Sequence, residues 1–127
     1  MNGIKFLLDT NCVFFLLQGK LNSFQDNLAL KEIAISVITK MEFLSNPKLD
    51  PKDTYLFDHF LDEITTLYIT ESDENLINET VAIRKKYKLK LPDAITASTA
   101  LSNSLTLIIA DAAFSKIHNL KFQFIKS

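Results

Sequence analysis

Short apolar runs alternate with longer amphipathic segments along the whole chain. Residues 4–8, 33–35, 67–69 and 105–109 form apolar runs typical of buried strands. The run at 105–109 is apolar except for Thr106, as is expected of a parallel strand that is covered on both faces. Phe alternates with a polar residue over residues 122–124, which predicts an edge strand there.

Helices are predicted between these runs, from capping residues and from apolar positions at helical spacing. The first covers residues 11–18, and Gly19 is suited to its C-terminal cap. The later helices are predicted to begin at a capping residue or a proline: Ser36, Asp50 with Pro51, Ser72, and Pro92. A short helix is predicted over residues 112–117.

This alternation of strands and helices predicts an α/β fold with a mostly parallel central sheet and helices on both faces. A chain of 127 residues is expected to form a single domain, residues 1–127. An apolar fraction of 47% is sufficient for a real core and argues against disorder.

Composition excludes several classes of site. The net charge of -1 provides no global basic field, so any nucleic-acid site must be local. A single cysteine, Cys12, excludes a disulfide framework and a cysteine zinc site, and two glycines exclude Gly-rich phosphate loops. The apolar runs are too short to cross a membrane. We therefore expect a cytoplasmic protein without a membrane partner.

Acidic residues follow two of the predicted strands. Asp9 comes directly after the run at 4–8, and Asp111 follows the run at 105–109. In parallel sheets ligands bind beyond the carboxyl ends of the strands, so these two carboxylates can meet at one edge.

Two more acids suit the same place. Glu42 lies between Met41 and Phe43 on the helix after the second strand, and Asp93 lies in the first turn of the helix opened by Pro92. Taken singly, such acids more often cap a helix, complement its dipole or face solvent. Converging carboxylates repel one another, and a hard divalent ion such as Mg²⁺ or Mn²⁺ relieves that repulsion. The four together therefore suggest metal-assisted phosphodiester chemistry.

Four segments, in order, carry a resemblance to a known family: LLDTN at residues 7–11, ITKMEFL at 38–44, LPDAITASTAL at 91–101 and LTLIIADAAF at 105–114. They resemble the PIN domain family, and more closely the VapC toxins of bacterial type II toxin–antitoxin pairs. The resemblance covers essentially the whole chain. It implies a PIN-like three-layer sandwich and a metal-dependent endoribonuclease that cleaves RNA phosphodiester bonds.

The resemblance also implies the site and its partners. The acidic site would consist of Asp9, Glu42, Asp93 and Asp111, with Asn11 assisting by hydrogen bonding near Asp9. The ligands of Mg²⁺ or Mn²⁺ would be Asp9, Asp93 and Asp111. Partners would be the RNA substrate, a second copy of the chain in a homodimer, and a cognate antitoxin whose tail enters the active-site groove.

The last motif departs from the family pattern. The family commonly has Thr-Asn-Asp and then a further Asp before Phe, whereas the corresponding residues here are Ile109, Ala110 and Asp111, with Ala113 in place of the second Asp. This keeps open a second hypothesis, that a catalytically weakened PIN-like domain binds RNA or a protein without cutting. A phosphoacceptor receiver domain is disfavoured, since it needs adjacent acids after the first strand and Asp9 lies between Leu8 and Thr10.

Basic residues are concentrated at 84–90, RKKYKLK, directly before the Asp93 segment. They can stabilise the C-terminus of a helix or bind phosphates, with Tyr87 available for stacking. The RNA-binding candidates are Arg84, Lys85, Lys86, Lys88 and, one turn beyond Asp111, Lys116.

Overall fold

The computed structural model describes residues 3–19 and 29–125, and within them a five-stranded sheet forms the centre of the molecule. All strand pairs are parallel, in the order β3-β2-β1-β4-β5. The strands are β1 (Phe6–Leu8), β2 (Ile33–Ser36), β3 (Thr65–Leu67), β4 (Thr106–Ile109) and β5 (Phe122–Phe124). The order places β1 beside β4, so the two strands that precede Asp9 and Asp111 are neighbours.

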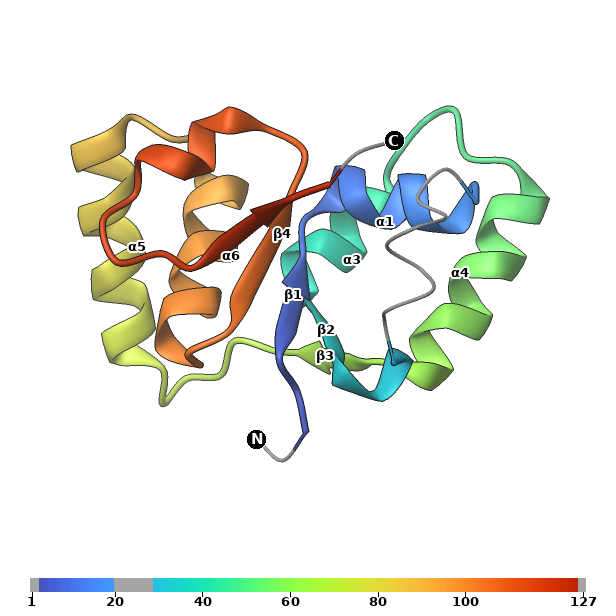
Figure 1. Cartoon of the computed structure of the whole chain (residues 1–127), viewed down its shortest axis with the longest axis horizontal. Coiled ribbons are helices and arrows are strands. Elements are labelled where there is room, and N and C mark those ends of the chain that lie inside the picture. Colours follow the sequence, from blue (N-terminus) through green and yellow to red (C-terminus); the bar gives the residue numbers. More distant parts are fainter. Residues whose placement is uncertain (1–2, 20–28, 126–127) are drawn as a thin grey trace.

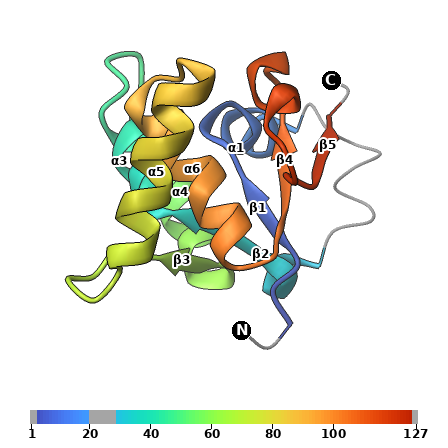
Figure 2. The ribbon, with the colours of Figure 1, turned by 90° about the vertical axis from the view of Figure 1, so that its left-hand side faces the viewer.

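Helices cover both faces of the sheet (Figures 1 and 2). One side carries α1 (Thr10–Leu17), α3 (Val37–Leu44) and α4 (Pro51–Glu63), and the other carries α5 (Glu74–Tyr87) and α6 (Leu91–Ser102). Two short 3₁₀ helices, η1 (Leu30–Glu32) and η2 (Ala112–Lys116), complete the described elements. The predicted three-layer α/β sandwich is therefore confirmed.

Two hydrophobic cores lie on the two faces of the sheet, because successive strand residues point in opposite directions. On β4, Leu107 and Ile109 pack with the small residues of α6, whereas Ile108 packs with α1 and α4. All three strand residues are fully buried, as predicted for a parallel strand covered on both faces.

Most predicted helix starts agree with the structure. Ser36 caps α3 by accepting a hydrogen bond from the backbone N–H of Ile38 at 3.1 Å, and Asp50 and Asp53 form a reciprocal capping box on α4. None of the helices within the described part of the chain combines the length and the apolar character needed to span a membrane.

Some predicted boundaries are wrong. The strand predicted at 67–69 lies at Thr65–Leu67, and α5 begins after Asp73 rather than after Ser72. The Asp73 carboxylate accepts a hydrogen bond from the backbone N–H of Thr70 at 2.7 Å, which folds residues 70–73 into a turn. The helix predicted at 112–117 is a 3₁₀ helix ending at Lys116.

Candidate active site

A cavity of about 340 Å³ lies where β1 and β4 end. It is lined by all five residues that the sequence singled out for the acidic site: Asp9, Asn11, Glu42, Asp93 and Asp111. They come from the start of α1, from α3, from the first turn of α6 and from the turn before η2. The parallel order of the strands brings these elements, distant in the sequence, to one edge of the sheet.

The Asp9 carboxylate faces two backbone N–H groups in the wall of this cavity. It caps α1, since its Oδ1 accepts a hydrogen bond from the backbone N–H of Cys12 at 2.9 Å, and its Oδ2 faces the backbone N–H of Ala110 at 3.5 Å. Asp9 is only 6% exposed. Burial raises the pKa of its carboxyl group, and these N–H donors oppose that rise.

Glu42 is oriented by a hydroxyl group from another helix. The Oγ1 of Thr10 donates a hydrogen bond to Oε1 of Glu42 at 2.6 Å, which joins the first residue of α1 to α3. A bond of this length to a carboxylate is strong and leaves Oε2 of Glu42 for other partners. The sequence motif at residues 7–11 contains Thr10 but indicates no role for it, because its partner is 32 residues away.

Asp93 interacts electrostatically with the other three acids of the cavity. It is the third residue of α6 and is half-buried. Burial raises the pKa of its carboxyl group, and the negative charges of Glu42, Asp111 and Asp9 raise this pKa further. Lys90 opposes the rise. Lys90 was not among the predicted site residues, although it belongs to the basic segment before Asp93.

Asp111 and Asn11 form the exposed side of the cavity. The Oδ1 of Asp111 accepts a hydrogen bond from the backbone N–H of Ala113 at 2.9 Å and so caps η2. Helix capping and a place at the acidic site are thus compatible. The backbone N–H of Ala110 faces Asp9, and this contact needs no side chain at position 110.

The donor set of the cavity fits a hard divalent cation. Its acidic residues offer only oxygen ligands, and their mutual charge is what such an ion neutralises. Within residues 3–19 and 29–125, no three His, Cys, Asp or Glu side chains form a group that could hold a metal ion unaided. Mg²⁺ does not require such a group, because it keeps several waters and is usually bound through one or two carboxylates.

The predicted RNA-binding residues do not line the cavity. Arg84, Lys85, Lys86 and Lys88 are exposed at the end of α5, and Lys116 is exposed at the end of η2. The end of α5 lies beside the end of η2, because the hydroxyl oxygen of Tyr87 accepts a hydrogen bond from the backbone N–H of His118 at 2.9 Å. Lys88 ends α5 in the left-handed conformation, with φ 56°, so its position also has a structural role.

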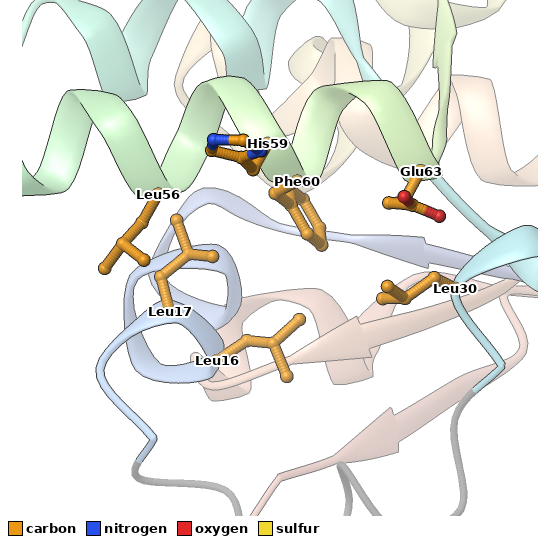
Figure 3. Close-up of a pocket in the computed structure, with 7 residues that line it drawn as sticks. All are labelled: Leu16, Leu17, Leu30, Leu56, His59, Phe60 and Glu63. Atoms are coloured by element: carbon orange, nitrogen blue, oxygen red, sulfur yellow. The ribbon is translucent and has the colours of Figure 1, made fainter.

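A second cavity, of about 480 Å³, lies between α1 and α4 (Figure 3). The described residues that line it are mostly apolar: Leu16, Leu17, Leu30, Leu56 and Phe60, with His59 and Glu63. His59 is exposed and packs edge-on against Tyr55, with ring centroids 4.4 Å apart, as expected of a surface histidine. This larger cavity offers one carboxylate, whereas the smaller one gathers four, so the smaller one is the candidate active site.

Comparisons with known proteins agree with this architecture. A family model described as "PIN domain" matches residues 6–120. No curated protein matches the chain. A chain of a toxin–antitoxin complex from Klebsiella pneumoniae is 31% identical, with 91% of this chain and 95% of that chain covered and a TM-score of 0.75.

Two further solved structures share the fold at lower identity. VapBC2 from Rickettsia felis, bound to a DNA fragment from its promoter, has a TM-score of 0.79 at 22% identity, covering 97% of this chain and 100% of that one. DNA-bound VapBC from Salmonella typhimurium has a TM-score of 0.76 at 22% identity, covering 95% and 98%.

Proposed function

The chain belongs to the PIN domain family, and from this premise we propose that it is a metal-dependent endoribonuclease. The observation that carries the proposal is the convergence of four carboxylates on one cavity, where their charges raise the pKa of Asp93. Such a site suits hydrolysis of a phosphodiester bond, in which negative charge develops on the phosphoryl oxygens.

In this proposal Asp9, Asp93 and Asp111 hold Mg²⁺ or Mn²⁺, one or two of them directly and the rest through waters that the ion keeps. The bound ion would supply a water of lowered pKa and would neutralise developing negative charge. Thr10 keeps the Glu42 carboxylate aimed at the cavity, so that Glu42 can orient an attacking water. Asn11, at the cavity mouth, assists by hydrogen bonding near Asp9.

We also propose that the chain is the toxin of a VapBC-type pair. Support comes from the 31% identity to a chain of the Klebsiella pneumoniae toxin–antitoxin complex, over most of both chains. A cognate antitoxin whose tail enters the active-site groove, a homodimer and a cytoplasmic location belong to the same proposal.

A PIN-like domain that binds RNA or a protein without cutting is the second candidate. It is favoured by the alanines at positions 110 and 113, where the family commonly has Asn and Asp. The contact between the Ala110 N–H and Asp9 weakens this candidate, since Asp9 still receives a donor from that position.

Cleavage assays separate the two candidates. We expect the purified protein to cleave single-stranded RNA in Mg²⁺ or Mn²⁺, to stop in EDTA, and to recover when metal is added back, because converging carboxylates need a cation. The measurement is the rate of product formation on a denaturing gel. RNA that binds but stays intact in both ions would favour the non-cutting domain, and cleavage that persists in EDTA would contradict the metal-dependent mechanism.

The basic end of α5 gives a separate prediction about RNA binding. Replacing Lys85 and Lys86 with Gln and Lys88 with Asn, which tolerates the left-handed conformation, is expected to weaken binding. The log–log salt slope should fall by roughly 0.7 for each phosphate of a single strand that the variant no longer neutralises. The measurement is a salt series of RNA affinities.

The matched control neutralises Lys31, Lys52 and Lys121, which are exposed and do not line the acidic cavity. This control has the same net charge as the test variant. If the salt slope of RNA affinity is the same for the two variants, the α5 lysines do not bind phosphates and only stabilise the end of the helix.

A further inference from the structure

A stack of phenylalanine rings runs from the core to the acidic cavity. Phe43 lies between Phe14 and Phe57, with ring centroids 4.2 Å and 4.0 Å away and interplanar angles of 23° and 20°. Phe43 and Phe57 are fully buried, whereas Phe14 is half-buried. Phe43, itself packed on Phe57, therefore supports one face of the Phe14 ring.

Phe14 lies at the cavity end of this stack. It is one helical turn after Thr10 and Asn11, on the face of α1 that borders the acidic cavity. Phe14 lines this cavity, whereas the next residue, Phe15, packs in the same core but does not. The half-buried ring of Phe14 therefore lines the same cavity as the four carboxylates.

The surroundings of Phe14 suit a flat, neutral and aromatic ligand. A nucleobase has no net charge, so the nearby carboxylates do not repel it, and it can stack on an aromatic ring. Asn46 also lines the cavity, and its Oδ1 accepts a hydrogen bond from the backbone N–H of Lys48 at 2.9 Å. This leaves the amide N–H groups of Asn46 as donors for a ligand, and they match acceptor atoms on a base edge.

We propose that Phe14 forms a nucleobase-binding subsite beside the acidic cavity, where an unpaired base of single-stranded RNA stacks on its ring and Asn46 contacts the edge of that base. This inference rests on the proposed function and extends it. A stacked base anchors the strand next to the carboxylates, and duplex RNA, whose bases are already stacked on each other, is excluded. Because the ring is ordered by Phe43 and Phe57, binding costs little conformational entropy.

The test compares two probes in Mg²⁺: a short single-stranded 2′-O-methyl oligonucleotide, which resists cleavage, and an oligomer of the same length without bases. We expect wild type to bind the base-containing probe more tightly than the abasic one. Phe14→Leu should lose about fivefold to a hundredfold of affinity for the base-containing probe, with little change for the abasic probe. Phe15→Leu, a neighbouring residue in the same core cluster, is the control and should keep the wild-type preference.

A spectroscopic variant makes the test independent of packing losses in Phe14→Leu. The sequence has no tryptophan, so Phe14→Trp places a single indole in the protein. We expect its fluorescence to be quenched by the base-containing probe and unchanged by the abasic probe, while Phe15→Trp responds to neither. Circular dichroism melting checks that each variant is folded.

Three outcomes are distinguishable. Loss of base preference in Phe14→Leu, together with quenching in Phe14→Trp, supports the subsite. The subsite is overturned if wild type binds the two probes with equal affinity. It is also overturned if Phe14→Trp binds the base-containing probe without quenching of its fluorescence. Both results count even when wild type cleaves RNA. If wild type neither cleaves RNA nor binds either probe, the proposed function itself fails, and the subsite fails with it.

Discussion

Replacing Asp93 with Asn is expected to abolish RNA cleavage by the purified protein while leaving it folded, and Asp9→Asn is expected to do the same. Each substitution keeps the size of the side chain and removes a charge that a divalent cation needs. Because a bound metal stabilises transition-state charge by several kcal/mol, we expect the rate to fall by about a hundredfold or more. The measurement is the initial rate of cleavage in Mn²⁺, with circular dichroism as the check on the fold.

The matched control for this experiment is Asp58→Asn. Asp58 is exposed on α4 and does not line the acidic cavity, so this variant changes the net charge equally without touching the site. We expect it to cleave at the wild-type rate. Wild-type rates for both Asp9→Asn and Asp93→Asn would show that the acidic cavity is not where RNA is cut.

Without divalent metal, Asp93→Asn is expected to melt at a higher temperature than wild type at neutral pH. Burial and then the charges of Glu42, Asp111 and Asp9 raise the pKa of Asp93 above its usual value, so its ionised form is unfavourable in the folded protein. Asparagine removes that ionised group. Part of the gain is offset, because a negative charge in the first turn of α6 also interacts favourably with the helix dipole.

The same raised pKa determines how the stability of the metal-free wild type changes with pH. A folded-state pKa above the unfolded value means that the folded state binds more protons as the pH falls, so the free energy of unfolding rises. The destabilisation is complete above the raised pKa values of Asp9 and Asp93 and disappears below the usual pKa of an aspartate. We expect Asp93→Asn to show a smaller rise than wild type over that window.

Divalent metal should make wild type melt at a higher temperature than Asp93→Asn, the reverse of the order expected without metal. An ion that binds only the folded state stabilises it by about 2.7 kcal/mol at a hundredfold excess over its dissociation constant, or roughly ten degrees of melting temperature for a domain of this size. Wild type should therefore melt higher as Mn²⁺ is added, and Asp93→Asn should respond less. The measurement is a melting series in EDTA and in rising Mn²⁺, with Asp58→Asn as the control that should follow wild type. If wild type ignores Mn²⁺ and Asp93→Asn melts lower in EDTA, Asp93 is a helix-end stabiliser.

Local sequence patterns were sufficient for much of this architecture. The largely apolar run ending at Ile109 predicted a buried parallel strand. Ser36, Asp50 and Pro51 predicted helix starts correctly, because capping depends on neighbours within about four residues. The strand at Thr65–Leu67 was misplaced by two residues. The apolar side chains of Tyr68 and Ile69 extended the pattern, although both are exposed beyond the strand end.

The succession of elements follows from the sequence, since periodicity and capping are local properties of the chain. The same local patterns place Asp9 and Asp111 after strands, Asp93 in a first helical turn and Glu42 within a helix. Which of these groups come into contact depends on the tertiary structure. The Thr10 hydroxyl reaches Glu42 across 32 residues, and the Ala110 N–H faces Asp9 across 101 residues. The order of Phe14, Phe43 and Phe57 in one stack likewise depends on how α1, α3 and α4 pack together. A local pattern states that a side chain is buried but not what it contacts, because partners are chosen by strand order and helix packing across the whole chain.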